Sequence, residues 1–151
     1  MPADDVSEWP TGRLLSTAAR LVEQEWNAVL ARNGLNHAGL LTLHALRHGP
    51  HSQRELAACS FVEEQTMSRV LDRLERSGYV SRGRDPQDRR RLLVRGTDEG
   101  LAAYERSIGQ AQLEQMVAAQ VENPERFRAD LVALVHHLLP HTTEGLDPKR
   151  V

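Results

Sequence analysis

Residues 63–95 read EEQTMSRVLDRLERSGYVSRGRDPQDRRRLLVR, and this stretch decides how the rest of the chain is organised. It begins as an amphipathic helical pattern, passes a glycine, and continues as an arginine-rich hairpin pattern. It contains nine arginines and six acidic residues, a local net charge of +3 in a chain whose formal net charge is -2. A positive stripe on an otherwise acidic protein indicates a polyanionic partner.

The first part of the stretch predicts a two-faced helix. At about 100° per residue, an apolar face and a polar face separate. The apolar face contains Met67, Val70, Leu71 and Leu74, and the polar face contains Gln65, Arg69, Asp72, Arg73 and Arg76. Glu63 and Glu64 stand at the N-terminus, where negative charge suits the helix dipole, and Gly78 is the residue expected just past the last turn.

The second part of the stretch predicts a β-hairpin. Residues 79–84 and 91–95 have the pattern of two short strands. The segment 85–88 between them has the pattern of a turn, because Pro86 presets φ at the second turn position.

Three consecutive arginines follow this turn. Arg89, Arg90 and Arg91 suit insertion into a narrow minor groove, where the potential is most negative. Asp88 is acidic, so we expect it to orient Arg90 through a charge-assisted hydrogen bond instead of contacting DNA. A solvated basic loop is the alternative interpretation of the same residues.

Helical patterns precede the stretch. Apolar residues spaced i, i+4, i+7, i+8 predict a long helix over 12–33, which Asn33-Gly34 ends. Asn36 can cap a second, shorter helix. Ser52 and Glu55 fit a capping box at the start of a third helix.

Two further helices are expected after the hairpin. Thr97 can cap a long helix that runs to Val121, with acidic residues in its first turn. Asn123-Pro124 breaks that helix, and an apolar pattern from Phe127 to Leu139 predicts a last one. The chain therefore reads as mainly α, with the helix and hairpin order of a winged helix-turn-helix.

In such a motif the second helix of the pair enters the major groove. Gln65 can address adenine, and Arg69 can address guanine. Thr66 and Ser68 suit a phosphate or a thymine methyl. The candidate phosphate contacts are Arg73 on that helix, and Ser52 and Gln53 at the N-terminus of the helix before it. A surface helix with solvated charges is the alternative interpretation.

Composition and motifs argue against several other classes. Cys59 is the single cysteine, so an intramolecular disulfide, a four-cysteine zinc site and a CxxC redox motif are excluded. Residues 1–10 have no apolar signal-peptide region, and no apolar run approaches about 18 residues, so we expect a cytoplasmic protein with no membrane partner. Without GxSxG, HExxH or a Gly-rich phosphate loop, neither enzymatic activity nor a cofactor is expected.

Histidines need separate weighing because an i, i+4 pair can bind zinc. His44 and His48 have that spacing, and His136, His137 and His141 cluster near the C-terminus. No cysteine or carboxylate completes a ligand set by local spacing, so no metal site is predicted. His44 is then a core or pocket-lining residue.

Residues from about 35 to 100 resemble the MarR family of bacterial transcription regulators. The resemblance rests on Glu55-Leu56-Ala57, Thr66-Met67-Ser68-Arg69, Asp72-Arg73-Leu74-Glu75, Gly78-Tyr79-Val80, Arg82, Asp85-Pro86, Asp88-Arg89-Arg90 and Thr97-Asp98-Glu99-Gly100. It implies a single domain over 1–151, with a DNA-binding head at 35–95 and dimerisation helices at 12–33 and 97–140. It also implies a homodimer with an effector cleft between the dimer helices and the head.

Four positions depart from the family pattern: Ser60 and Phe61 in the turn before the second helix of the pair, Gly96 before Thr97, and Arg91. Phe61 stands in the turn where glycine is usual, and it is a candidate to pack against a neighbour. Arg91 stands where a small residue is usual and adds a positive charge to the hairpin.

We therefore expect a dimeric, sequence-specific DNA-binding regulator, and a repressor in particular, because a bound dimer most simply blocks polymerase. A small phenolic or amphipathic effector would enter the cleft near Trp26 and His44. Two alternatives stay open: a zinc-responsive regulator that uses the histidines, and a winged-helix module that binds an acidic protein partner.

Overall fold

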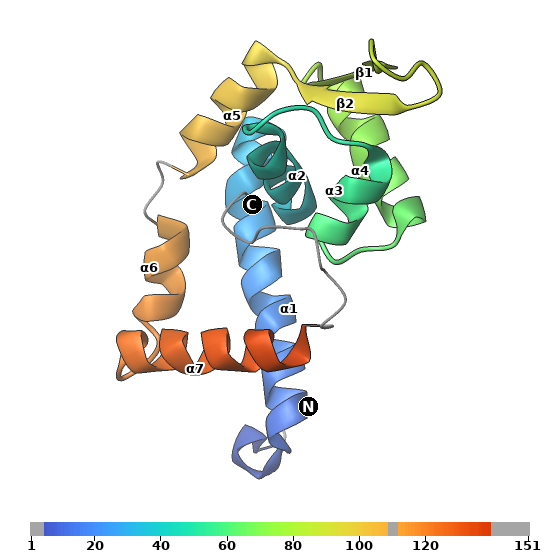
Figure 1. The fold of residues 1–151 in the computed structure, drawn as a ribbon. Helices are drawn as coiled ribbons and strands as arrows, with labels where there is room; N and C mark the ends of the chain where they lie inside the picture. The colour runs from blue at the N-terminus through green and yellow to red at the C-terminus, as the bar shows by residue number, and fades with distance from the viewer. Residues whose placement is uncertain (1–4, 109–111, 140–151) are drawn as a thin grey trace.

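The computed structural model describes residues 5–108 and 112–139 (Figure 1). In chain order the elements are η1 (Val6–Glu8), α1 (Thr11–Leu30), η2 (Ala31–Asn33), α2 (His37–Leu46), α3 (Gln53–Cys59), α4 (Glu64–Arg76), β1 (Val80–Arg84), β2 (Leu92–Gly96), α5 (Asp98–Ile108), α6 (Gln112–Ala118) and α7 (Pro124–Leu138). A head made of α2, α3, α4 and the hairpin lies at one end of α1, while α6 and α7 lie beside its other half. The predicted fold class, mainly α with a two-stranded wing, is confirmed.

Helix ends in the head follow from local hydrogen bonding. Gly34 takes the left-handed conformation with φ 68° and ends the first helical segment. The Asn36 carboxamide oxygen then accepts from the Gly39 amide at 2.8 Å and starts α2. At α3 the Glu55 amide donates to Ser52 Oγ at 3.2 Å, and the Ser52 amide donates to Glu55 Oε2 at 2.7 Å. The predicted stop, cap and capping box are therefore confirmed.

The hydrophobic core of the head is formed by side chains from one face each of α2, α3, α4 and β2. Its largest fully buried side chains include Leu43 from α2, Leu56 from α3, Met67 and Leu71 from α4, and Val94 from β2. Burying each such side chain contributes roughly 1.5–3 kcal/mol relative to leaving it exposed. This face of α4 is thus committed to packing, which leaves its opposite face to solvent.

Both strands of the hairpin begin one residue later than predicted, and the second strand also ends one residue later. The strands are antiparallel and pair Val80 with Gly96 at the base of the wing. His51 extends this small sheet, since its amide donates to the Val94 carbonyl at 3.1 Å and the Val94 amide donates back at 2.8 Å. These two bonds fasten the segment before α3 to β2.

The helix expected from Thr97 to Val121 is present as two helices, α5 and α6. Thr97 caps α5, since its Oγ1 accepts at 3.0 Å from the amide three residues on. Positions 109–111, between the two helices, and position 140, the expected end of the dimerisation segment, lie outside the described residues. Val121 lies beyond the end of α6 at Ala118. Asn123 is extended, as residues before proline favour, and it caps the start of α7.

Outside the head, large apolar side chains face solvent. Leu30 is the only buried residue of the 20-residue α1, and α7 contains none. The exposed set on these two helices is Leu14, Leu15, Leu21, Phe127, Val132, Leu134, Val135 and Leu138. An exposed apolar surface of this extent marks an interaction site. None of the described helices meets the length and apolarity that a membrane crossing requires.

Candidate nucleic-acid interface

The polar face of α4 is presented to solvent. Gln65, Thr66, Arg69 and Arg73 are exposed, and Ser68 is half-buried. Their backbone is held in place because the opposite face of α4 is locked into the core. The structure therefore brings together the five predicted side chains of this helix as one continuous polar surface.

The two predicted residues at the start of α3 have roles within the protein. Ser52 Oγ is an acceptor in the capping box. The Gln53 side-chain amide donates at 3.2 Å to the carbonyl of Glu64, in the first turn of α4. Gln53 thus links the first turns of the two helices, a contact that no local spacing in the sequence indicates.

The tip of the wing is closed by its own hydrogen bonds. The Asp85 amide donates to the Arg91 carbonyl at 2.8 Å, and the Arg91 amide donates to the Asp88 carbonyl at 2.9 Å. The Asp88 carboxylate accepts from the main-chain amide of Arg90 at 3.1 Å. The expected bond to the Arg90 guanidinium is therefore replaced by a backbone bond, because a short aspartate side chain in a turn reaches the amide two residues on.

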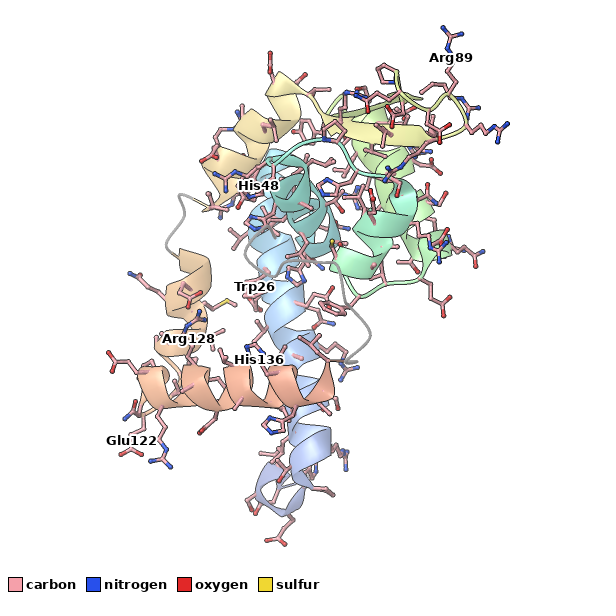
Figure 2. The ribbon with its side chains drawn as sticks, in the orientation of Figure 1. Trp26, His48, Arg89, Glu122, Arg128 and His136 are labelled. Atoms are coloured by element: carbon pink, nitrogen blue, oxygen red, sulfur yellow. The ribbon has the colours of Figure 1, made fainter. Side chains whose placement is uncertain are left out.

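The three arginines of the wing differ in their surroundings. Arg89 and Arg90 are exposed, and Figure 2 shows Arg89 projecting from the tip of the wing away from the body of the protein. The Arg91 guanidinium instead donates to the Glu55 carboxylate at the start of α3. Only two of the three predicted wing arginines therefore extend without an ion pair among the described residues.

Arg82 holds the base of the wing to α4. Its guanidinium lies 2.7 Å from Asp72 and 3.1 Å from Glu75, and its side chain is 22% exposed. The sequence pattern does not single out Arg82 as a site residue, because its partners lie on a different element. Two acidic residues one turn apart on the exposed face of α4, Asp72 and Glu75, are the only sequence signal that anticipates such a clamp.

Phe61, in the turn between α3 and α4, was expected to pack against a neighbouring residue. Its side chain is 73% exposed, so it does not pack into a neighbour as expected. It has φ 53°, the one positive φ among the described non-glycine residues. The backbone of the turn is thus kept in the conformation that suits glycine, and the aromatic side chain is directed outward.

The two residues of the predicted effector cleft are not brought together. Trp26 lines a cavity of about 630 Å³ between α1, α6 and α7, whose walls are mainly apolar. In Figure 2, Trp26, Arg128 and His136 surround this space. His44 does not line it, because its Nδ1 lies 2.6 Å from the hydroxyl of Tyr104 on α5. The cavity beside Trp26 thus does not include His44, and the pairing of the two residues in one effector cleft stays a prediction.

A cluster of polar side chains around Tyr104 joins α2 to α5. Arg47 lies 3.5 Å from Glu105, and its guanidinium is 5.1 Å from the centre of the Tyr104 ring. The rings of His44 and His48 are 6.3 Å apart in a T-shaped arrangement. Among the described residues, no three histidine, cysteine, aspartate or glutamate side chains are grouped to hold a metal ion, and His141 lies outside them.

Cys59 and His37 are the described groups of the helical body whose pKa is shifted toward the neutral form. Burial, and next the charge of Glu55, raises the pKa of the Cys59 thiol. Burial beside the Trp26 ring, whose centre is 4.8 Å away, lowers the pKa of His37, while Glu23 acts in the opposite direction. A raised thiol pKa means that little of the Cys59 side chain is thiolate, which makes the thiol unreactive.

Comparisons with known proteins find similarity to transcription regulators of one family. Residues 33–91 match the profile of the MarR family. The chain is 39% identical over 69 residues to the HTH-type transcriptional repressor NicR of Pseudomonas putida, a match covering 45% of this chain and 44% of that protein. It is 36% identical over 92 residues to the uncharacterized HTH-type transcriptional regulator YwoH of Bacillus subtilis, covering 60% of this chain and 66% of that protein. The matches thus span about half to two thirds of these curated relatives.

The fold itself matches over a longer range. A cysteine-to-serine mutant of MarR from E. coli, solved in complex with operator DNA, aligns with a TM-score of 0.76 and 27% sequence identity. That alignment covers 91% of this chain and 100% of the other. The similarity therefore extends beyond the head to the flanking helices.

Proposed function

The chain belongs to the MarR family of winged helix-turn-helix transcription regulators, and we propose that it binds a specific duplex DNA site as a dimer. The observation that carries the proposal is the exposed polar face of α4, held rigidly beside a wing with two exposed arginines. The family consists of regulators, not enzymes, and DNA binding would place this one in the bacterial cytoplasm.

The polar face of α4 would read the major groove. Gln65 would form paired hydrogen bonds with adenine, and Arg69 with guanine. Thr66 and Ser68 would contact phosphate or a thymine methyl, and Arg73 would contact phosphate one turn further on. Ser52 and Gln53, at the start of α3, would lie against a phosphate.

The wing would enter the adjacent minor groove. Arg89 and Arg90 extend from a loop whose shape is set by Asp85 and Asp88, so little ordering cost is left at binding. A narrow minor groove concentrates negative potential, which favours an inserted arginine.

The exposed apolar residues of α1 and α7 that do not line the cavity beside Trp26 support a homodimer; they are Leu14, Leu21, Leu134 and Leu138. In a two-fold dimer the same patch on each protomer contacts its counterpart, so one apolar surface covers another. Two heads would then sit about 34–36 Å apart or a multiple of it, matching half-sites of a pseudo-palindrome. The dimer would act as a repressor, since a bound protein most simply blocks polymerase.

The cavity beside Trp26 would be the effector site. Its volume of about 630 Å³ is in the range of small-molecule pockets, and Arg128 and His136 give its apolar walls a polar rim. A phenolic acid has the matching chemistry. By linkage, such a ligand weakens DNA binding only as far as it prefers the conformation that does not bind DNA.

The test begins with selection of a duplex from a random library, followed by titration at several salt concentrations. We expect a steep fall of log K with log salt. Arg90→Ala should cost about 1–3 kcal/mol of binding free energy, whereas Arg126→Ala, an exposed arginine on α7, should leave it unchanged. Failure to select any sequence, with an acidic protein bound instead, would overturn the DNA proposal.

A further inference from the structure

We infer that Arg91 is a positioning residue of the wing and not a DNA contact: its ion pair with Glu55 ties the wing to the N-terminus of α3, so that Arg89 and Arg90 are presented in a fixed direction. The inference rests on the proposed DNA-binding function.

A single carboxylate makes the connection. Glu55 Oε2 accepts from the Ser52 amide at 2.7 Å and closes the capping box, while Oε1 accepts from the Arg91 guanidinium. The side chains are 45% exposed for Arg91 and 39% exposed for Glu55, so neither is fully open to a ligand. Glu55 therefore connects the start of a helix of the head to the wing.

The backbone of Arg91 is at the point where the wing loop closes. Its carbonyl accepts from the Asp85 amide at 2.8 Å, and its amide donates to the Asp88 carbonyl at 2.9 Å. Restraining the Arg91 side chain therefore restrains the base of the loop that carries the two exposed arginines.

A second ion pair restrains the other strand. Arg82 on β1 is held by Asp72 and Glu75 of α4. The wing is thus attached once to α4 through β1 and once to α3 just before β2. Both attachments together hold the wing in one direction relative to α4. A wing that is already oriented loses less conformational freedom when it binds DNA.

The pairing of the Arg91 charge is a second, independent reason why Arg91 would not act as a phosphate contact. A guanidinium paired with a carboxylate has its charge balanced within the protein, so as long as the pair is intact it neutralises no phosphate and releases no counterion from DNA. The number of phosphates neutralised sets the salt dependence, with a slope of about -0.9 per phosphate on B-DNA. Arg91 and a true phosphate contact therefore predict different slopes.

The experiment measures affinity for the selected duplex against salt in the full-length protein and its variants. Glu55→Gln removes the charge yet keeps a residue that can complete the capping box, so the helix start is preserved. Arg91→Ala and Glu55→Gln should each weaken binding about two- to fivefold with the slope unchanged, as expected for losing a partly exposed ion pair. Arg90→Ala, the matched wing arginine, should lower the slope by about 0.9.

Two further variants complete the test. The double variant Glu55→Gln/Arg91→Ala should bind like either single variant, because both remove the same interaction. Arg91→Lys keeps the positive charge and should recover most of the affinity. Hydrogen exchange without DNA should speed up over residues 85–91 in Arg91→Ala and Glu55→Gln.

The opposite result is equally specific. A slope that falls by about 0.9 in Arg91→Ala, together with wild-type affinity in Glu55→Gln, would make Arg91 a phosphate contact and overturn the inference. Failure of the proposed function itself looks different, because the wild-type protein would then show no salt-dependent binding to any duplex.

Discussion

Replacing Phe61 by glycine and by alanine tests whether the turn of the head stores backbone strain. Phe61 has φ 53° and a side chain that is 73% exposed, so little packing is lost with the ring. The left-handed conformation costs an L-residue roughly 1–2 kcal/mol, which glycine escapes. Glycine in turn loses about 0.4–1 kcal/mol through the greater freedom of the unfolded chain.

These opposing effects leave Phe61→Gly more stable than Phe61→Ala by about 1 kcal/mol. At an exposed helical position the order reverses, since glycine is about 0.5–1 kcal/mol less stable than alanine there. Ala102→Gly on α5 is the matched control, because Ala102 is exposed and helical. The sign of the glycine–alanine difference should therefore change between the two sites.

Urea denaturation followed by circular dichroism gives both differences. The protein concentration must be held constant, because the proposed dimerisation would make the apparent stability depend on it. A change of midpoint at constant m reports stability alone. If the Phe61→Ala protein proves equal to or more stable than the Phe61→Gly protein, while Ala102→Gly destabilises as expected, the turn is not strained and the reasoning is refuted.

Three further outcomes can be measured on the protein without DNA. Gly100→Ala should destabilise by about 3 kcal/mol in urea denaturation, because its Cβ would overlap the main-chain oxygen of Tyr79; unchanged stability would mean that the turn can shift. Burial, the largest influence, raises the pKa of Glu55, but hydrogen bonds from Ser52 and Arg91 bring it below its ordinary value. The contribution of the Glu55 carboxylate to the free energy of unfolding should therefore be complete above the unfolded carboxyl pKa of about 4.3. It should be lost as the pH falls through the lower pKa of the folded state. The stability difference between wild type and Glu55→Gln should thus shrink in acid, and a pH-independent difference would contradict this. Leu138→Glu, at a side chain that is 72% exposed, should shift the sedimentation coefficient from dimer to monomer, whereas Ala133→Glu on α7 should not.

Elements whose ends depend on neighbours a few residues away follow directly from the sequence. The Asn36 cap, the Ser52–Glu55 capping box and the glycine stop after α4 involve groups within four residues of one another. The two faces of α4 follow in the same way, because a helix turns by a constant angle per residue and burial then selects the apolar side. The residues that face solvent on α4 were therefore predictable.

Contacts between elements depended on the tertiary structure. Nothing in the spacing of Arg91 and Glu55, or of Arg82 and Asp72, shows that they meet, because packing of the hairpin against α3 and α4 brings them together. The contact of His44 with Tyr104 has the same origin, since α5 packs against α2, while α1, α6 and α7 line the cavity beside Trp26.

By itself, the sequence determined a mainly helical winged head, the polar residues on the exposed face of α4 and at the tip of the wing, and the resemblance to the family. Those features arise from periodicity, caps and charge along one stretch of chain. The tertiary structure alone decided that Arg91 of the wing is held by an ion pair while Arg89 and Arg90 are not, because an ion pair between distant residues forms only when the core has placed their backbones within reach.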